Sequence, residues 1–122
     1  ARGIPVNIAD DPARCDFILP SVLERGDLAI AVSTGGRSPA LARKIRIELE
    51  GAYGPEYAAL AAILGEVREK VIAGGRPSAE NRGLFEAVVS SDILDHIRAG
   101  RWKGVEELIR ELTGVEMEVR PR

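Results

Sequence analysis

A strand, a glycine turn and a capped helix follow one another within residues 28–49, and this pattern constrains the fold more than any other. The apolar run 28–32 is short and bounded by turn residues, which favours a buried strand over a helix. The pair Gly35-Gly36 ends it, because glycine accepts backbone angles that other residues resist. Ser38 and Pro39 then have the pattern of a helix N-cap and a first helical residue.

The start of this predicted helix is suited to an anionic ligand. Leu41, Ile45 and Leu49 recur at a spacing of four and give the helix one apolar stripe. The glycine turn and the helix N-terminus aim backbone N–H groups at one point, and Arg37 adds a full positive charge there. Ordinary capping of a βα connection needs the same Ser-Pro pair, so the structural and the binding interpretation both stay open.

Composition excludes several classes of function. The chain has 122 residues, enough for one domain or for part of a larger one, and 45% of them are hydrophobic. A net charge of −2 argues against generic nucleic-acid binding, which needs a basic excess. The apolar runs fall short of the ~20 residues of a membrane span. The single cysteine, Cys15, cannot form an internal disulfide and indicates a reducing, cytoplasmic compartment.

The chain opens on a short β-like run, residues 4–9, followed by Asp10-Asp11-Pro12. Asp11 before Pro12 has the pattern of an N-cap and its first helical residue, which leaves Asp10 at the carboxyl end of the strand. Open α/β sheets bind ligands just outside such strand ends. Asp10 is therefore a candidate acid or base, with a second turn residue as the alternative.

A β-hairpin is expected next. Residues 17–23 form an apolar run interrupted by Pro20, residues 24–27 form a tight turn, and Leu28 begins the second strand. Pro20 cannot donate to a ladder, which places its strand at an edge or forces a bulge. A lone hairpin is unstable in water, so this edge needs a partner strand.

The rest of the chain has helical patterns. Pro55 begins a helix that ends at Gly74, and three shorter segments follow at 79–89, 91–99 and 102–112. Apolar residues of the first helix are spaced as in a helix–helix seam: Tyr57, Leu60, Leu64, Val67 and Val71. The tail from residue 115 to 122 alternates apolar and charged residues, as in a short strand or a frayed end.

These elements predict an α+β fold, with short strands and a hairpin followed by a helical C-terminal region. The long seam finds no equally long partner helix in the chain, and the hairpin edge is unsatisfied. Both features predict a homodimer, in which two copies bury these surfaces together. His96, the only histidine, is interpreted as a half-buried helix residue and not as a metal ligand, because no second histidine or cysteine joins it.

Three stretches resemble the siroheme synthase family, the precorrin-2 dehydrogenase / sirohydrochlorin ferrochelatase proteins. They are Val-Asn-Ile-Ala-Asp-Asp-Pro at 6–12, Phe-Ile-Leu-Pro-Ser at 17–21 and Ala-Val-Ser-Thr-Gly-Gly-Arg-Ser-Pro-Ala-Leu-Ala-Arg at 31–43. The likeness continues more loosely to about residue 112. It implies a Rossmann half that binds NAD, a central dimerisation segment and a helical region. It also implies oxidation of precorrin-2 to sirohydrochlorin with NAD and, in many members, insertion of ferrous iron as a substrate.

The resemblance assigns roles to particular residues. The aspartate of the Asn-x-x-Asp motif, the general acid/base of the family, falls on Asp10, and the asparagine, Asn7, falls in the cofactor set. A serine that is phosphorylated in some members falls on Thr34. The turn and the helix that follows would hold the carboxylates of the tetrapyrrole through Thr34, Gly35, Gly36, Arg37, Ser38 and Arg43.

One departure from the family is the missing Gly-x-Gly-x-x-Gly fingerprint, which holds the NAD pyrophosphate. We therefore expect the C-terminal part of such a protein: residues 1–11 as the last strand of a truncated Rossmann-like domain, 12–53 as the central dimerisation and substrate segment, and 54–122 as the helical domain. By itself this chain is expected to be inactive and to bind no NAD measurably.

Two alternatives come from other classes of protein. Residues 33–38 are also similar to the phosphate loop of phosphosugar-isomerase domains, whose fold needs a complete parallel sheet. The second alternative is a helical dimerisation module without activity of its own.

Overall fold

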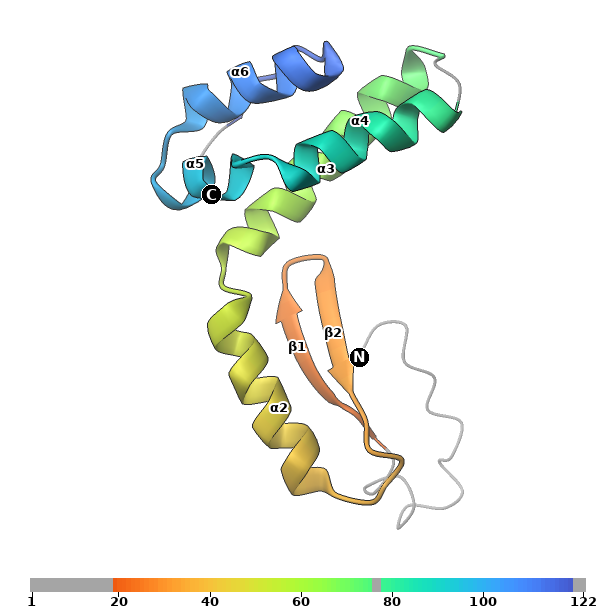
Figure 1. The fold of residues 1–122 in the computed structure, drawn as a ribbon, viewed down its shortest axis with the longest axis vertical. Helices are drawn as coiled ribbons and strands as arrows, with labels where there is room; N and C mark the ends of the chain where they lie inside the picture. The colour runs from red at the N-terminus through yellow and green to blue at the C-terminus, as the bar shows by residue number, and fades with distance from the viewer. Residues whose placement is uncertain (1–18, 76–77, 120–122) are drawn as a thin grey trace. The chain divides into compact units, whose positions relative to one another are not determined.

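The computed structural model describes residues 19–75 and 78–119, and side chains in the second range from Asn81 onward. The chain divides into two compact units, Ala1–Gly54 and Pro55–Arg122, which we call the hairpin unit and the helical unit. Figure 1 shows the elements of each unit along the chain. The predictions for the strand at 4–9, for Cys15 and for the candidate residues Asn7 and Asp10 lie outside the described residues.

The hairpin unit contains an antiparallel pair of strands, β1 (Ser21–Arg25) and β2 (Leu28–Val32). Leu23 lies opposite Ile30, and Arg25 lies opposite Leu28. The hairpin is therefore confirmed, but the predicted turn at 24–27 was too long. Glu24 and Arg25 belong to the strand, because Gly26, with a φ of 61°, closes the chain in a two-residue turn with Asp27. Pro20 precedes the strand, where its missing N–H costs no ladder bond.

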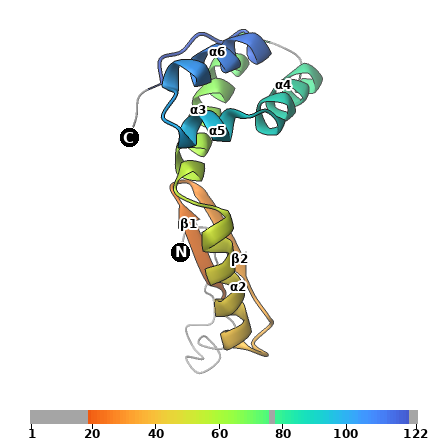
Figure 2. The ribbon, with the colours of Figure 1, turned by 60° about the vertical axis from the view of Figure 1, so that its left-hand side comes forward.

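One helix, α2 (Pro39–Ala52), runs along one face of the hairpin (Figures 1 and 2). Its predicted N-cap is confirmed: the Ser38 hydroxyl accepts a hydrogen bond from the Leu41 amide at 3.1 Å, and Pro39 follows the cap. The predicted apolar stripe is displaced, because Ala42 is the buried residue of the helix and Leu41 is 47% exposed. Ile45 and Leu49 are half-buried.

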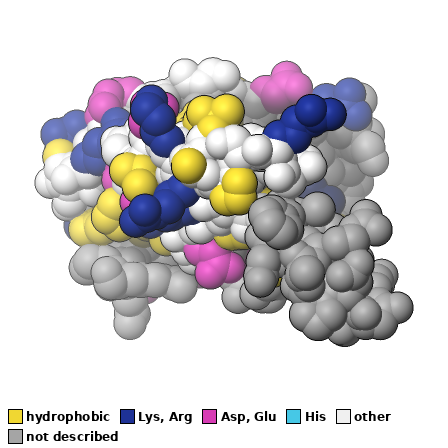
Figure 3. Space-filling model, turned by 90° about the horizontal axis from the view of Figure 1, so that it is seen from below, with side chains coloured by type: hydrophobic (Ala, Val, Ile, Leu, Met, Phe, Trp, Pro, Cys, Tyr) yellow, Lys and Arg dark blue, Asp and Glu magenta, His cyan; other side chains and the backbone are white. Residues whose placement is uncertain are grey.

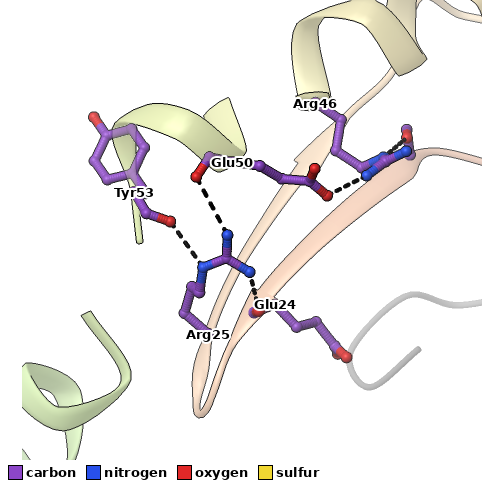
Figure 4. A network of polar contacts seen from close by, with 6 residues as sticks. Glu24, Arg25, Arg46, Glu50 and Tyr53 are labelled. Carbon is purple, nitrogen blue, oxygen red and sulfur yellow. Dashed lines mark hydrogen bonds and ion pairs between the residues drawn. The ribbon is translucent and has the colours of Figure 1, made fainter. Parts of the chain in front are cut away.

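Two arginine side chains join α2 to the hairpin (Figure 4). The Arg25 guanidinium donates through Nε to the Tyr53 carbonyl at 2.8 Å and through Nη2 to the Glu50 carbonyl at 3.3 Å. Arg46 donates to the Ser21 hydroxyl at 2.6 Å and forms an ion pair with Glu50. Arg25 thus satisfies carbonyls at the end of α2, where a cation also interacts favourably with the helix dipole.

The helical unit consists of α3 (Glu56–Ala73), α4 (Ser78–Ser90), α5 (Ile93–Arg98) and α6 (Trp102–Thr113). The helical segments predicted from the sequence are confirmed. Its apolar core is formed by Leu60, Ile63, Val67, Val71, Val88, Ile93, Ile97, Val105, Ile109, Val115 and Val119.

The seam predicted on α3 is used within the chain. Leu60, Val67 and Val71 are buried in the core, and Tyr57 and Leu64 pack against it. As expected, none of the three following helices is as long as α3, but residues of all three join the seam in one core. The expected burial of this seam against a second copy is therefore not needed to cover Leu60, Val67 and Val71.

Residues 115–119, the described part of the tail after α6, form no strand and are held by hydrogen bonds and by the core. Gly114 ends α6 in the left-handed conformation, and the Thr113 hydroxyl donates to the Ile109 carbonyl and accepts from the Val115 amide. Residues 115–119 have no strand partner within the described part of the chain, and Val115, Met117 and Val119 contact the core. The Val119 amide donates to the Glu106 carboxylate at 2.9 Å.

The fold is α+β, with a two-stranded antiparallel hairpin followed mainly by helices. The described residues contain no parallel sheet, so the phosphate-loop fold of the isomerase alternative is not found among them. None of the described helices is long and apolar enough to cross a membrane.

Candidate functional site

The turn between β2 and α2 contains most of the candidate binding residues and is held by side-chain hydroxyls. The Thr34 hydroxyl accepts a hydrogen bond from the Ser38 amide at 2.8 Å and donates one to the Ser38 carbonyl at 3.1 Å. The Ser33 hydroxyl accepts from the Gly35 amide at 3.1 Å. Gly35 and Gly36 have φ angles of 67° and 82°, which side chains rarely allow. The glycine pair is therefore required by the backbone.

These contacts change how the turn can bind an anion. The Arg37 amide donates to the Thr34 carbonyl at 3.2 Å, and the amides of Gly35, Ser38 and Leu41 donate to hydroxyl groups of the turn. Four backbone N–H groups of the turn and the helix start thus have partners within the chain, although such groups were expected to face a ligand. An anion at this turn would be met chiefly by side-chain charge, which Arg37 supplies from an exposed position.

Arg43 lies on the exposed face of α2 and lines a shallow hollow of about 300 Å³. The other lining residues are Ala40, Lys44, Ile47 and Glu48. Lys44 and Glu48 form an ion pair at 2.9 Å, and this hydrogen bond raises the pKa of Lys44. The hollow does not include Arg37, so the structure gives the two candidate arginines separate positions on the hairpin unit.

The surface in Figure 3 carries hydrophobic side chains interspersed with Lys, Arg, Asp and Glu. No single type of side chain dominates the part of this face that the structure describes. A mixed surface of this kind is consistent with the small net charge of −2. An anionic ligand would therefore meet individual Lys and Arg side chains and not a continuous basic patch.

His96 is held between α5 and α6. Its Nδ1 accepts a hydrogen bond from Arg101 Nε at 3.0 Å, and its Nε2 lies 3.6 Å from an Asp92 carboxylate oxygen. The ring packs against Gly104, where an added Cβ would lie 2.9 Å from His96 Nδ1. His96 is thus a half-buried helix residue, as its sequence position indicated.

An ion pair joins the start of α3 to the end of α5. Arg98 Nε donates to a Glu56 carboxylate oxygen at 2.9 Å, and this hydrogen bond raises the pKa of Arg98. Within the described residues, no group of three His, Cys, Asp or Glu side chains is arranged to hold a metal ion.

A groove between α3 and α4 was not anticipated from the sequence. Two adjoining hollows, of about 430 and 300 Å³, share Arg68 and Phe85 in their walls. Their other lining residues are Leu64, Gly65, Ile72, Asn81, Arg82 and Glu86. The available signal was Gly65, a glycine within the helical pattern of residues 56–73.

Two family models match the chain in order. The model described as "Sirohaem biosynthesis protein central" matches residues 25–52, and that described as "Sirohaem synthase dimerisation region" matches residues 56–112. The first covers most of the described hairpin unit, and the second covers all four helices of the helical unit almost completely.

Curated relatives show the same similarity. The siroheme synthase of Thiobacillus denitrificans is 40% identical over 101 residues, which are 83% of this chain and 21% of that protein. The siroheme synthase of Pseudomonas entomophila is 38% identical over 112 residues, 92% of this chain and 24% of that protein. The chain thus spans about a fifth to a quarter of the length of these relatives.

A solved structure shares the fold. The structure titled "SirC, precorrin-2 dehydrogenase" superposes with a TM-score of 0.64 at 22% sequence identity, covering 80% of this chain and 46% of that one. At this identity the likeness concerns the fold alone.

Proposed function

This chain belongs to the siroheme synthase family, and from that premise we propose that it is part of an enzyme of siroheme biosynthesis that oxidises precorrin-2 to sirohydrochlorin with NAD and inserts ferrous iron. The observation that carries the proposal is the ordered match of a central model at residues 25–52 and a dimerisation model at 56–112. A helical dimerisation module alone would not require the central turn. In the family interpretation, the turn belongs to the substrate site.

The proposed substrate site combines the turn and helix α2. Precorrin-2 is a polycarboxylate, and exposed guanidinium groups bind carboxylates through two parallel hydrogen bonds. Arg37 and Arg43 supply these charges, and Thr34, Gly35, Gly36 and Ser38 hold the turn in shape. Asp10 is proposed as the general acid/base that moves a proton of the macrocycle.

The glycine turn does not fit the NAD pyrophosphate. Gly35-Gly36 lacks the Gly-x-Gly-x-x-Gly spacing, and hydroxyl groups within the turn already occupy the Gly35 and Ser38 amides. We therefore derive no redox step through NAD from this chain and assign only Asn7 to the cofactor. The pyrophosphate site belongs, in this proposal, to the full-length protein, and this chain alone is expected to be inactive.

The proposal extends to organisation, assembly and location. Residues 1–11 are assigned to the end of a Rossmann-like domain, 12–53 to the central dimerisation and substrate segment, and 54–122 to the helical domain. The protein is proposed to be cytoplasmic. It is also proposed to be a homodimer, and the family description of residues 56–112 as a dimerisation region supports this assembly.

The chemical role of Asp10 is tested by Asp10→Asn in the full-length protein. This change keeps the shape and removes the base, so turnover of precorrin-2 should fall by about 10²–10⁴ with little change in KM. Asp11→Asn is the matched control, because asparagine also serves as an N-cap. Turnover of Asp10→Asn at the wild-type rate would remove Asp10 from the mechanism.

The binding role of Arg37 is tested by Arg37→Ala. Loss of a charge-assisted contact should weaken sirohydrochlorin binding by about 1.5–3 kcal/mol and leave the chemical step unchanged. Lys103→Ala removes an exposed cation that the proposal does not assign to the substrate, and it should leave the affinity close to that of the wild type. Unchanged binding in Arg37→Ala would exclude this role for the turn.

A further inference from the structure

We propose that the groove between α3 and α4 receives the same groove of a second copy of this chain, related by a twofold axis. The proposal rests on the homodimer proposed above and specifies which surface of the helical unit forms the contact. The buried seam of α3 is excluded as that surface, because its residues lie in the core of their own unit. The groove is a hollowed, partly apolar surface along the same helix.

Large apolar side chains line and border the groove. Leu64 and Phe85 form its walls while packing on the core beneath, and Ile72 at one end is 55% exposed. Val89, one helical turn beyond Phe85 on α4, is also 55% exposed but does not line the groove. Exposed apolar surface of this kind, bordered by charged residues, is typical of protein interfaces.

Gly65 leaves room for another chain at the groove. A glycine inside a helix costs about 0.5–1 kcal/mol relative to alanine. An added Cβ at Gly65 would meet no atom within 4 Å, as at Gly83, but Gly65 lines the groove and Gly83 does not. Gly104 is the contrasting case, where the His96 ring of the same chain fills the space.

The charges of the groove favour a second copy over an unrelated partner. Arg68 from α3 and Arg82 and Glu86 from α4 line it, and none of these three makes an ion pair within the described part of the chain. In a twofold contact each residue of one copy meets its counterpart site on the other, so a surface must complement itself. Arg68 and Glu86 can pair in this way across the axis, and Arg82 remains as an additional cation on each copy.

A stable interface buries about 800 Å² on each partner, which is more than a groove of this size supplies. We therefore expect the groove to contribute a central contact to a larger interface. A substitution that blocks it should weaken the dimer without abolishing it.

The first test is Gly65→Gln, followed by sedimentation velocity across a dilution series. Glutamine favours helix and its Cβ has free space, so the variant should keep the wild-type Tm or exceed it. Its longer side chain fills the groove, and the dimer dissociation constant should rise by about tenfold or more. Gly83→Gln is the matched control: Gly83 is also a helical glycine with free space, but it does not line the groove.

The second test exchanges the charges. Arg68→Glu and Glu86→Arg should each weaken their own homodimer, and an equimolar mixture should form the heterodimer, because both cross-contacts then pair opposite charges. Native mass spectrometry measures this rescue. A wild-type dimer that Gly65→Gln leaves unchanged, or a mixture without rescue, overturns the groove while the homodimer stands. A wild-type chain that stays monomeric overturns the homodimer itself, and with it the groove.

Discussion

The hairpin unit and the helical unit are stabilised by different interactions. Among the described residues of the hairpin unit, only Leu23 and Ala42 are buried hydrophobic residues. The helical unit buries an apolar cluster to which all four helices contribute. At about 25 cal/mol per Å² of buried apolar surface, burial is a much larger stabilising term in the helical unit.

Polar contacts replace the missing core in the hairpin unit. Arg25 binds the last carbonyls of α2, Arg46 binds Ser21, and the Thr34 and Ser38 hydroxyls fix the turn before α2. Each of these contacts depends on direction as well as distance. The unit that holds the candidate substrate turn thus gains a defined geometry from few residues, whereas the helical unit gains stability from many.

The largest effect is expected from Ile109→Ala. Ile109 is completely buried in the helical core, so its truncation should lower the free energy of unfolding of that unit by about 2–5 kcal/mol. The single tryptophan, Trp102, lies in α6 and reports this unit in urea denaturation. Ile109→Val, as the control, should cost about 0.5–1.5 kcal/mol. Equally accelerated amide exchange in α2 would show that the units unfold together and would break the comparison.

The second largest loss of stability is expected from Gly104→Ala. The new Cβ would lie 2.9 Å from His96 Nδ1 and 3.2 Å from Cε1, so the ring must move and lose its hydrogen bond from Arg101. Overpacking of this kind costs about 1–3 kcal/mol. Gly83→Ala, in free space on α4, should instead raise stability by about 0.5–1 kcal/mol. Equal thermal denaturation of the two variants would contradict the packing of His96 on Gly104.

Arg25→Met should affect the hairpin unit alone. Methionine keeps the apolar stem and removes the guanidinium, which releases the Glu50 and Tyr53 carbonyls at the end of α2. We expect a loss of about 1–2 kcal/mol, measured as faster amide exchange in the last turn of α2. Arg43→Met, at an exposed position of the same helix, should change exchange little. A shift in the Trp102 signal would mean that the stability of the helical unit depends on this cap.

The smallest effect is expected from Ser38→Ala. It removes the oxygen that accepts from the Leu41 amide, and the loss of an N-cap costs about 1 kcal/mol. Hydrogen exchange at the Leu41 amide should accelerate more than exchange at amides in the centre of the helix. Ser38→Asp, which retains a capping oxygen, should keep the wild-type rate, and equal rates in both variants would remove Ser38 from the cap.

The sequence predicts best those features that neighbouring residues decide. The Ser38 cap and the helices from Pro55 onward depend on patterns within a few residues, and the structure confirms them. The end of β1 was misplaced because Glu24 and Arg25 resemble turn residues locally. Arg25 is fixed in the strand partly by its contact with Tyr53, 28 residues away, which no local pattern contains.

The candidate site shows the same limit. Its glycine pair and capped helix were predictable from composition and order alone. The hydrogen-bond partners of the turn amides were not predictable. A threonine hydroxyl such as that of Thr34 can bind a ligand or the backbone of its own turn, and the sequence does not distinguish the two. The seam of α3 was misinterpreted for a related reason: periodicity identifies an apolar face but not the chain that covers it.

The arginine cap on α2 also makes the two units respond differently to dissolved salt. Mobile ions screen the attraction between the Arg25 guanidinium and the carbonyl end of the helix, so rising ionic strength weakens this contact. Sulfate, by contrast, strengthens the burial of apolar surface and acts on the core around Ile109. The ionic composition of the solvent therefore sets which part of the chain opens first.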